Sequence, residues 1–243
     1  MSQPSHSVLS TPAASVQRDG FCFATADVMR GLLERAGGLA DWPIFADSWN
    51  RLGPDPYIAA TGRLRRRRHA TFVATADQGV TLAPHQAHYQ SLQYNHLQGD
   101  IARWFEPVEA VFAASQCLHS ILCFCHAFFG GLAPDVMRWH VELHQFRIEA
   151  SAGAAGEPTP EGSHRDGVDF VLVLLVDREN IASGTTSIHA PDGTALGEFT
   201  LTRPLDAALI HDPRVFHGVT PVMPIAPQQP SHRDVLVVTF RAA

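Results

Sequence analysis

The second half of the chain carries the two-residue alternation and the short apolar runs that are typical of β-strands. Successive side chains of a strand point to opposite faces, so one buried face gives alternation and two buried faces give a continuous apolar run. From residue 139 such segments follow one another, separated by Gly, Pro and Asp, with no helical spacing between them. This order predicts a sandwich or barrel rather than a sheet with crossover helices. The expected strands are WHVELHQFRIEA (139–150), VDFVLVLLVD (168–177), GTTSIHA (184–190), ALGEFTLT (195–202), LDAALIHD (205–212), VFHGVTPV (215–222) and RDVLVVTFRA (233–242).

The first half predicts helices mixed with loops. Residues 25–38 begin with Thr and Asp near the start, space their apolar residues at helical intervals and end at a Gly pair. Residues 100–134 predict one or two further helices, with Pro107 breaking or beginning one of them. The Ser-, Pro- and Ala-containing residues 1–20 predict a poorly ordered tail.

The two halves predict a single domain over residues 21–243. Its helical part, about 21–135, is too small and too apolar on its faces to stand alone, so we expect it to pack on a β core over about 139–243. The fold class is therefore α+β with a mainly β core, a jelly-roll or cupin-like barrel with N-terminal helices packed on it.

Composition excludes several classes of protein and makes a metal site worth considering. The 243 residues are 45% hydrophobic and 17% charged, as in an ordinary soluble globular protein, and the net charge of −6 gives no pull toward nucleic acid or anionic membranes. There is no apolar run near the roughly 18 residues of a membrane span and no convincing secretory signal. Four cysteines in apolar surroundings predict free thiols, and we expect a cytoplasmic protein. Fourteen histidines are many for this length. The oligomeric state stays open.

The stretch SHRDGVDF (163–170) allows two interpretations. His-Arg-Asp begins the catalytic loop of a protein kinase, but that loop needs Asn five residues after its Asp, where this chain has Val171 in an apolar strand. In the other interpretation, His164 and Asp166 are two apart on a strand and present an imidazole and a carboxylate on one face. The second interpretation predicts a metal site.

Two ligands do not make a metal site, and His217 in a later strand is the candidate for the third. Two histidines and one carboxylate leave open coordination positions and suit non-haem Fe(II). Arg233 opens the last strand, where its guanidinium can form a two-pronged bond with the carboxylate of a molecule that chelates the iron. Arg241 has the same parity on that strand and is the rival for this role.

These residues lie in segments that resemble a known family. The segments are QSLQYNHLQGDIARWFEP (90–107), VELHQFRI (141–148), PEGSHRDGVDFV (160–171), HDPRVFHGVTPV (211–222) and RDVLVVTF (233–240). They are similar, over roughly residues 60–241, to 2-oxoglutarate/Fe(II) dioxygenases that include bacterial free-amino-acid hydroxylases such as isoleucine 4-hydroxylase. The biofilm, stress and motility protein family belongs to the same group.

The resemblance implies a double-stranded β-helix and an enzyme. It implies that His164, Asp166 and His217 bind Fe(II), that Arg233 binds the C5 carboxylate of 2-oxoglutarate, and that O2 is the other co-substrate. The expected function is hydroxylation of a small molecule, above all a free aliphatic L-amino acid. The alternative is a non-catalytic metal- or ligand-binding barrel linked to stress or biofilm signalling.

An amino-acid substrate needs a cation for its carboxylate and an acceptor for its ammonium group. Arg147 and Glu142 are the candidates, and His144, Gln145 and Tyr94 are further candidates for the substrate pocket.

Three other features favour structural roles. His140, Glu142 and His144 share a strand face but extend over about 13 Å, too far to converge on one ion. His211 and Asp212 precede a proline and predict turn residues. The basic run RLRRRRHATF (63–72) favours structural ion pairs or a solvated face over an anionic ligand, and its lack of interleaved aromatics disfavours nucleic acid. In a strand, alternation would place Arg63, Arg65 and Arg67 on one side.

Overall fold

Antiparallel β-sheets make up most of the protein. The computed structural model describes residues 11–59, 65–97 and 99–243. Its strands are β1 (Phe21–Ala24), β2 (Arg65–Thr75), β3 (Gly79–Leu82), β4 (Arg138–Glu149), β5 (Phe170–Glu179), β6 (Ile181–Ser183), β7 (Thr185–His189), β8 (Ala195–Thr200), β9 (Ala207–His211), β10 (Phe216–Val219), β11 (Val222–Pro224) and β12 (His232–Ala242).

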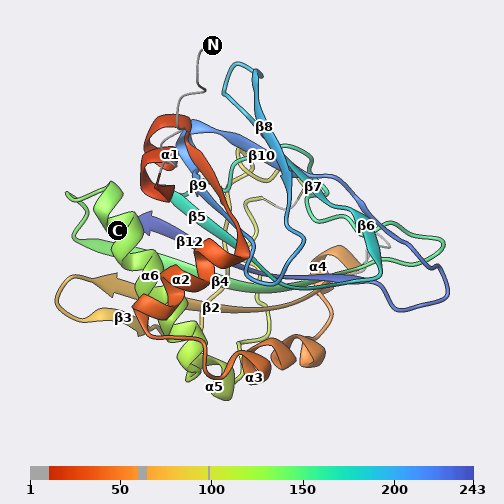
Figure 1. The fold of residues 1–243 in the computed structure, drawn as a ribbon, viewed down its shortest axis with the longest axis horizontal. Coiled ribbons are helices and arrows are strands. Elements are labelled where there is room, and N and C mark those ends of the chain that lie inside the picture. Colours follow the sequence, from red (N-terminus) through yellow and green to blue (C-terminus); the bar gives the residue numbers. More distant parts are fainter. Residues whose placement is uncertain (1–10, 60–64, 98) are drawn as a thin grey trace, which may run out of the picture.

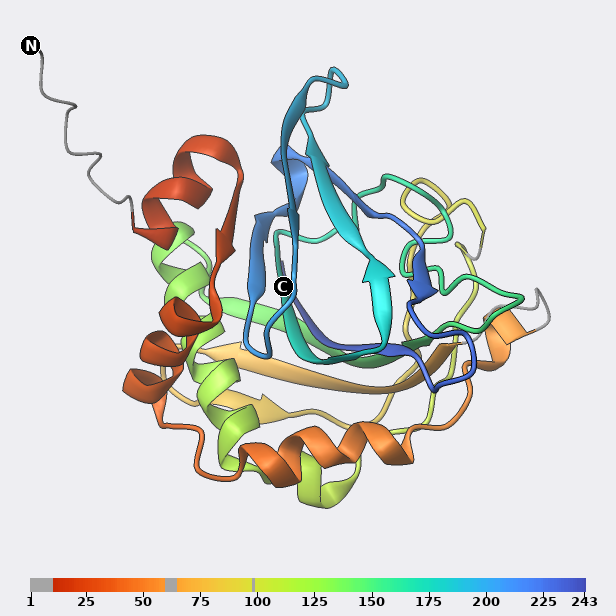
Figure 2. The same ribbon diagram turned by 45° about the vertical axis from the view of Figure 1, so that its right-hand side comes forward.

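The strands form one large sheet with smaller sheets standing across from it. The large sheet runs β1-β9-β5-β12-β4-β2-β3, and the smaller sheets are β10-β7-β8 and β11-β6. Figure 2 shows the small-sheet strands, cyan to blue, standing across from the long strands of the large sheet. This is the double-stranded β-helix that was expected, and all seven predicted strands are present with small shifts at their ends.

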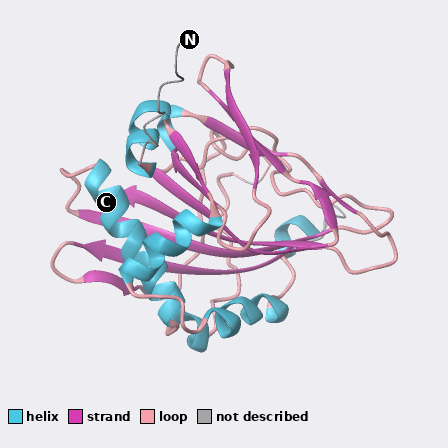
Figure 3. Cartoon of the chain, in the orientation of Figure 1, coloured by secondary structure: helices cyan, strands magenta, loops and turns pink. Residues whose placement is uncertain are grey.

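Helices cover the outer face of the large sheet. Figures 1 and 3 show them gathered on one side of the strands. Among the described residues no helix is both long and apolar enough to cross a membrane. The helical elements are α1 (Pro12–Asp19), α2 (Ala26–Ala36), α3 (Trp42–Asp47), η1 (Ser48–Arg51), α4 (Pro56–Ala59), α5 (Ala110–Ala113), α6 (Gln116–Leu132) and η2 (Asp212–Arg214).

The long strands separate two environments. One face of β5 and β12, with Leu172, Leu174 and Phe240, joins the main hydrophobic core under the helices. The other face of β5, with Val171 and Val173, packs between the two sheets. This double burial explains why the β5 sequence is a continuous apolar run.

Two predictions about the first half were wrong. Residues 12–19 of the expected tail form α1, whereas residues 1–10 lie outside the described residues. The part predicted as helical also holds β1, β2 and β3, and β2 pairs with β4 along its whole length. The arginines of β2 concealed its alternation, because they occupy both faces of the strand.

The predicted helix over residues 100–134 begins only at residue 110. The segment before it is irregular and lies along β2, where the His69 N–H donates to the Glu106 carbonyl and the Val108 N–H donates to the His69 carbonyl. Sheet-like bonds therefore satisfy this backbone, and Phe105 is buried without any helix. The helix α6 starts where the Asp41 carboxylate accepts the N–H groups of Gln116 and Cys117.

Phe129 of α6 joins the helical layer to the sheet, and its removal tests this packing. The ring is fully buried and stacks on Phe170 at 4.9 Å and contacts Phe240 at 5.3 Å. We expect Phe129→Ala to lower the free energy of unfolding by about 3–5 kcal/mol in urea denaturation. The exposed Val111→Ala should change it by less than about 0.5 kcal/mol. Equal effects of the two substitutions would contradict this packing role.

Candidate active site

The structure brings His164, Asp166 and His217 together. The two histidines exchange backbone hydrogen bonds of 2.9 Å, which join the segment before β5 to β10. The Asp166 Oδ1 lies 3.6 Å from His164 Nε2, and its Oδ2 lies 3.5 Å from His217 Nε2. All three ligand atoms lie within 4.8 Å of one another. These separations exceed a hydrogen bond and leave room for an ion bound at about 2.1 Å from each ligand.

Hydrogen bonds orient these side chains. His164 Nδ1 lies 3.1 Å from the Gly162 carbonyl oxygen, so its Nε2 faces the carboxylate. A ring nitrogen held in this way fixes the imidazole for metal binding through the other nitrogen. The Asp166 carbonyl oxygen accepts a bond of 3.2 Å from the Gln90 side chain.

Asp212 anchors the segment that carries the ligands. Its buried carboxylate accepts three backbone bonds, from the N–H groups of Asp166 at 2.9 Å, Gly167 at 2.8 Å and Val168 at 3.2 Å. Gly167 has a φ of +80°, and a Cβ there would lie 2.4 Å from the Tyr94 ring. The sequence assigned Asp212 to a turn, and the structure adds the role of fixing the metal-ligand segment.

Charge within the triad is unevenly shared. Burial disfavours a charge on His164, but the facing carboxylate of Asp166 outweighs burial and raises the pKa of His164 to about 9. Burial, reinforced by the charge of His164, lowers the pKa of His217 to about 4. Burial also opposes ionisation of Asp166, but both histidines hold the pKa of its carboxyl well below the usual range. The Asp166 carboxylate and the neutral His217 imidazole therefore face the position that a metal ion would occupy.

Arg233 presents a buried cation to the same cavity. The cavity has a volume of about 580 Å³, and the triad and Arg233 all line it. The Arg233 side chain is 2% exposed, and its Nε and Nη2 have no hydrogen-bond partner among the residues that the structure describes. Burial, followed by the charge of Arg178 opposite it on β5, lowers the pKa of Arg233 to about 10. A buried guanidinium without an anion is costly, so this position is suited to a ligand carboxylate.

Arg241 lies at the other end of β12. It is paired in register with His140 and is exposed to solvent, although it also lines the cavity. The geometry favours Arg233 over Arg241 as the carboxylate anchor, because only a desolvated guanidinium gains strongly from a buried partner.

The candidates for the substrate pocket divide between the two faces of β4. Glu142, His144 and Tyr94 line the cavity. Gln145 and Arg147 point to the opposite face, so their prediction as pocket residues was wrong. Gln145 donates to the Ser48 hydroxyl, and Arg147 pairs with Asp234 at 2.6 Å. Two-residue alternation excludes residues 145 and 147 once residues 142 and 144 face inward.

Several cavity residues escaped the sequence interpretation. Arg65 and Arg67 of the basic run line the cavity and share Asp55, while Arg66 pairs outward with Glu149. These contacts confirm structural ion pairs in the basic run, of which residues 63 and 64 lie outside the described residues. Alternation predicted that Arg65 and Arg67 share one side of the strand, which the structure confirms, but the sequence did not show that this side faces the cavity.

Glu142 and His144 do gather with other histidines. We expected the strand that carries His140, Glu142 and His144 to be too extended for these three side chains to bind one ion. His69 from β2 and His88 from the irregular segment instead complete a group with Glu142 and His144, whose ligand atoms all lie within 4.8 Å of one another. Only long-range contacts could place them there. Four side chains of metal-ligand type therefore form a second cluster in the same cavity wall.

A His-x-Asp pair, a distal histidine and a buried arginine inside a double-stranded β-helix define a non-haem iron oxygenase. The family model described as 2OG-Fe dioxygenase matches residues 46–239. The chain belongs to this family, whose enzymes use Fe(II), 2-oxoglutarate and O2.

Individual relatives agree with this assignment. The crystal structure of a bsmA homolog from Methylobium petroleophilum PM1 is 35% identical with a TM-score of 0.86, covering 96% of this chain and 92% of that chain. The L-isoleucine-4-hydroxylase of Bacillus thuringiensis is 26% identical over 185 residues, 74% of this chain and 76% of that protein. The 3(1)-hydroxy-L-isoleucine 4-dioxygenase of Pantoea ananatis is 22% identical over 238 residues, 94% of each. The protein is thus an enzyme, and the non-catalytic alternative is not favoured.

Substitution of Asp212 tests its anchoring role. Asp212→Ala leaves three backbone N–H groups without their acceptor, so we expect Fe(II) affinity to fall about 10- to 100-fold. The free energy of unfolding should fall by about 1–3 kcal/mol. Anaerobic titration with Fe(II) and urea denaturation measure the two effects. Asp212→Asn keeps one acceptor oxygen and should be intermediate, and unchanged iron affinity in Asp212→Ala would rule out the anchoring role.

Proposed function

We propose that this protein hydroxylates a free aliphatic L-amino acid, with consumption of O2 and 2-oxoglutarate and release of succinate and CO2. The observation that carries the proposal is the shared cavity, in which the His164, Asp166 and His217 side chains and the unpartnered Arg233 face one volume. The printed activities of the Bacillus and Pantoea relatives support an amino acid as the substrate.

In this proposal His164, Asp166 and His217 hold the iron. Two imidazole nitrogens and one carboxylate oxygen are a donor set that suits Fe(II) and leaves positions open on one side, and binding of the ion would release the proton of His164. Bound iron and 2-oxoglutarate supply the activation of O2 that hydroxylation of a carbon requires. The protein's part is to hold the three ligands through the 164–217 backbone pair and the Asp212 anchor.

Arg233 binds the distal carboxylate of 2-oxoglutarate. The carboxylate would supply the partner that Nε and Nη2 lack among the described residues, and the apolar side chains of Val235 and Ile148 on the cavity wall would shield the pair from solvent. A charge-assisted bond gains strength in such surroundings. The co-substrate is thereby oriented with its other end free to reach the iron ligands.

Iron-dependent turnover tests the proposed reaction. The protein, purified without oxygen and supplied with Fe(II), 2-oxoglutarate, O2 and a panel of free L-amino acids, should form succinate together with a product heavier by one oxygen atom. His217→Ala should abolish both, because two ligands no longer hold the ion. His119→Ala on the exposed side of α6 serves as the control and should retain activity. The proposal is refuted if no succinate forms with any amino acid of the panel and none forms when the amino acid is left out.

The co-substrate anchor has its own test. Arg233→Ala should raise the 2-oxoglutarate KM by about 10- to 150-fold, the equivalent of a lost charge-assisted bond of about 1.5–3 kcal/mol. Arg241→Ala should leave this KM near the wild-type value. The reverse result would transfer the anchor to Arg241.

A further inference from the structure

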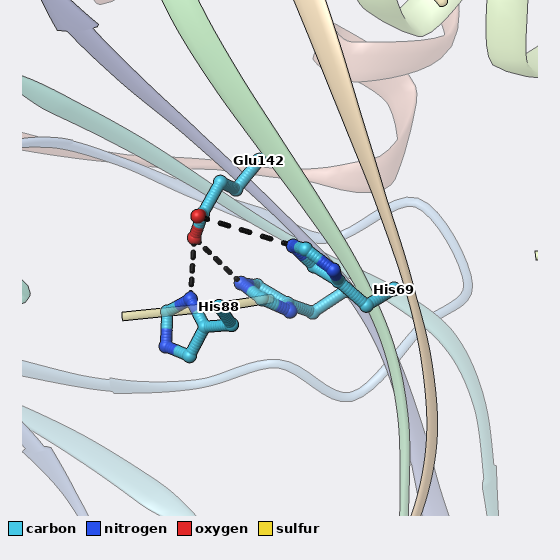
Figure 4. A group of neighbouring side chains, drawn as sticks. His69, His88 and Glu142 are labelled. Atoms are coloured by element: carbon cyan, nitrogen blue, oxygen red, sulfur yellow. Dashed lines mark hydrogen bonds and ion pairs between the residues drawn. The ribbon is translucent and has the colours of Figure 1, made fainter. Parts of the chain in front are cut away.

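The second cluster surrounds one carboxylate. Glu142 of β4 has His88 Nδ1 at 2.5 Å and His144 Nε2 at 3.6 Å from its Oε2. His140 Nε2 lies 3.5 Å and His69 Nε2 lies 4.0 Å from the other oxygen, Oε1. Figure 4 shows the carboxylate reaching toward His69 and His88, which come from different segments of the chain. Four imidazoles thus converge on a single acid at the cavity wall.

This cluster is not arranged for a metal ion. The shortest separation, 2.5 Å between His88 and Glu142, is that of a direct hydrogen bond, whereas the carboxylate-to-imidazole distances within the iron triad are 3.5 and 3.6 Å. Arg67 Nη2 lies 2.8 Å from His144 Nδ1. A guanidinium can only donate, so Nδ1 accepts and the neutral ring carries its proton on Nε2, where a metal would need a lone pair. The cation of Arg67 also repels a second cation.

Glu142 is a largely buried negative charge instead, with its side chain 13% exposed. Burial favours its protonated form, but the facing imidazoles of His140, His144 and His88 outweigh burial and hold the pKa of Glu142 well below the usual range. The carboxylate lines the cavity together with His140, His144 and His88. A cationic group that enters the cavity therefore finds an ionised acceptor on this wall.

Arg67 supplies the complementary charge on the same wall. Its side chain is 3% exposed, and its guanidinium lies 3.5 Å from the centre of the Phe105 ring. The Nε atom has no hydrogen-bond partner in the described ranges of the chain. Asp55 lies closer to Arg65, at 2.7 Å, than to Arg67, at 3.6 Å. Arg67 therefore keeps capacity for an anion.

We infer that Glu142 and Arg67 form the subsite that holds the ammonium and carboxylate groups of a free α-amino acid. The inference rests on the proposed hydroxylase function and names the head-group contacts of its substrate. One imidazole, that of His144, separates the two charges, with Arg67 at 2.8 Å from one ring nitrogen and Glu142 at 3.6 Å from the other. An α-amino acid that lies along the cavity side of this ring spans such a separation, because its charged groups are roughly 3 Å apart and each hydrogen bond adds about 2.9 Å.

The subsite and the iron ligands belong to one cavity. Glu142, His144 and Arg67 line it together with His164, Asp166 and His217. With its head group held by Glu142 and Arg67, the substrate directs its side chain toward the triad. The arrangement selects the side chain, rather than the α-carbon, for hydroxylation.

Substrate analogues test the subsite in the wild-type enzyme. The best amino acid of the panel is compared with its N-acetyl derivative, which lacks the ammonium charge, and its amide, which lacks the carboxylate charge. Loss of one charge-assisted bond should lower kcat/KM about 10- to 100-fold for each analogue. Equal kcat/KM for all three compounds would overturn the inference while leaving the hydroxylase function intact. If no amino acid is turned over at all, the proposed function itself fails.

Matched substitutions assign the two contacts. Glu142→Gln should raise the KM of the free amino acid and remove the discrimination against the N-acetyl compound. Glu149→Gln, on the same strand and paired outward with Arg66, should do neither. Arg67→Met should remove the discrimination against the amide, and Arg66→Met on the neighbouring position of β2 should not.

Two readouts separate this role from a structural one. Glu142→Gln and Arg67→Met should raise the KM of the free amino acid, whereas the KM for 2-oxoglutarate should stay near that of the Glu149→Gln and Arg66→Met controls, which should also keep wild-type succinate formation. Glu161 is the rival acceptor, because it also lines the cavity and lies 3.5 Å from His164. If Glu161→Gln removes the discrimination against the N-acetyl compound and Glu142→Gln does not, the ammonium site is at Glu161 and the inference is wrong.

Discussion

The strands β4 and β12 must satisfy opposite environments on their two faces, and their strict two-residue alternation makes this possible. On the helix-covered face, Trp139, Val141 and Leu143 of β4 belong to the main hydrophobic core. On the other face, His140, Glu142 and His144 of the same strand line a polar cavity. A slip of one residue in register would exchange the two sets and bury charge beneath the helices. The apolar face therefore fixes the position of every polar group on the opposite one.

Two charged side chains of the cavity have neighbours that compensate their burial. The Arg67 guanidinium lies against the Phe105 ring, and the Glu142 carboxylate is surrounded by imidazoles. Arg233 is the exception, since it lies opposite Arg178 on the adjacent strand without a carboxylate contact among the described residues. Like charges in this position destabilise a sheet. The fold thus accepts a local cost that the proposed binding of an anionic co-substrate would relieve, a common property of functional sites.

Much of the fold and the iron site could be predicted from the sequence, because both follow from local pattern. Each strand of the second half carries its own alternation, and His164, Asp166 and His217 lie in recognisable segments. The prediction of a helix over residues 100–134 was wrong for its first part, because hydrogen bonds to β2 hold that backbone in an irregular path. Such long-range bonds are not encoded in the local spacing of apolar residues. The prediction that Arg147 lines the substrate pocket was wrong, because it rested on the charge of the side chain and ignored which face of β4 the residue occupies. The cluster around Glu142 depends on β2 and on the irregular segment coming together, so no single stretch of sequence contains it.

The backbone pair between His164 and His217 has a topological consequence. The chain between these positions contains β5 to β9, including the small-sheet strands β7 and β8, and returns to its starting point at the triad. An ion held there would act as a cross-link that closes this loop and removes conformations from the unfolded chain. Binding of iron would then also stabilise the small sheet of β7, β8 and β10. Loss of iron would destabilise this wall of the cavity and abolish the reaction at the same time.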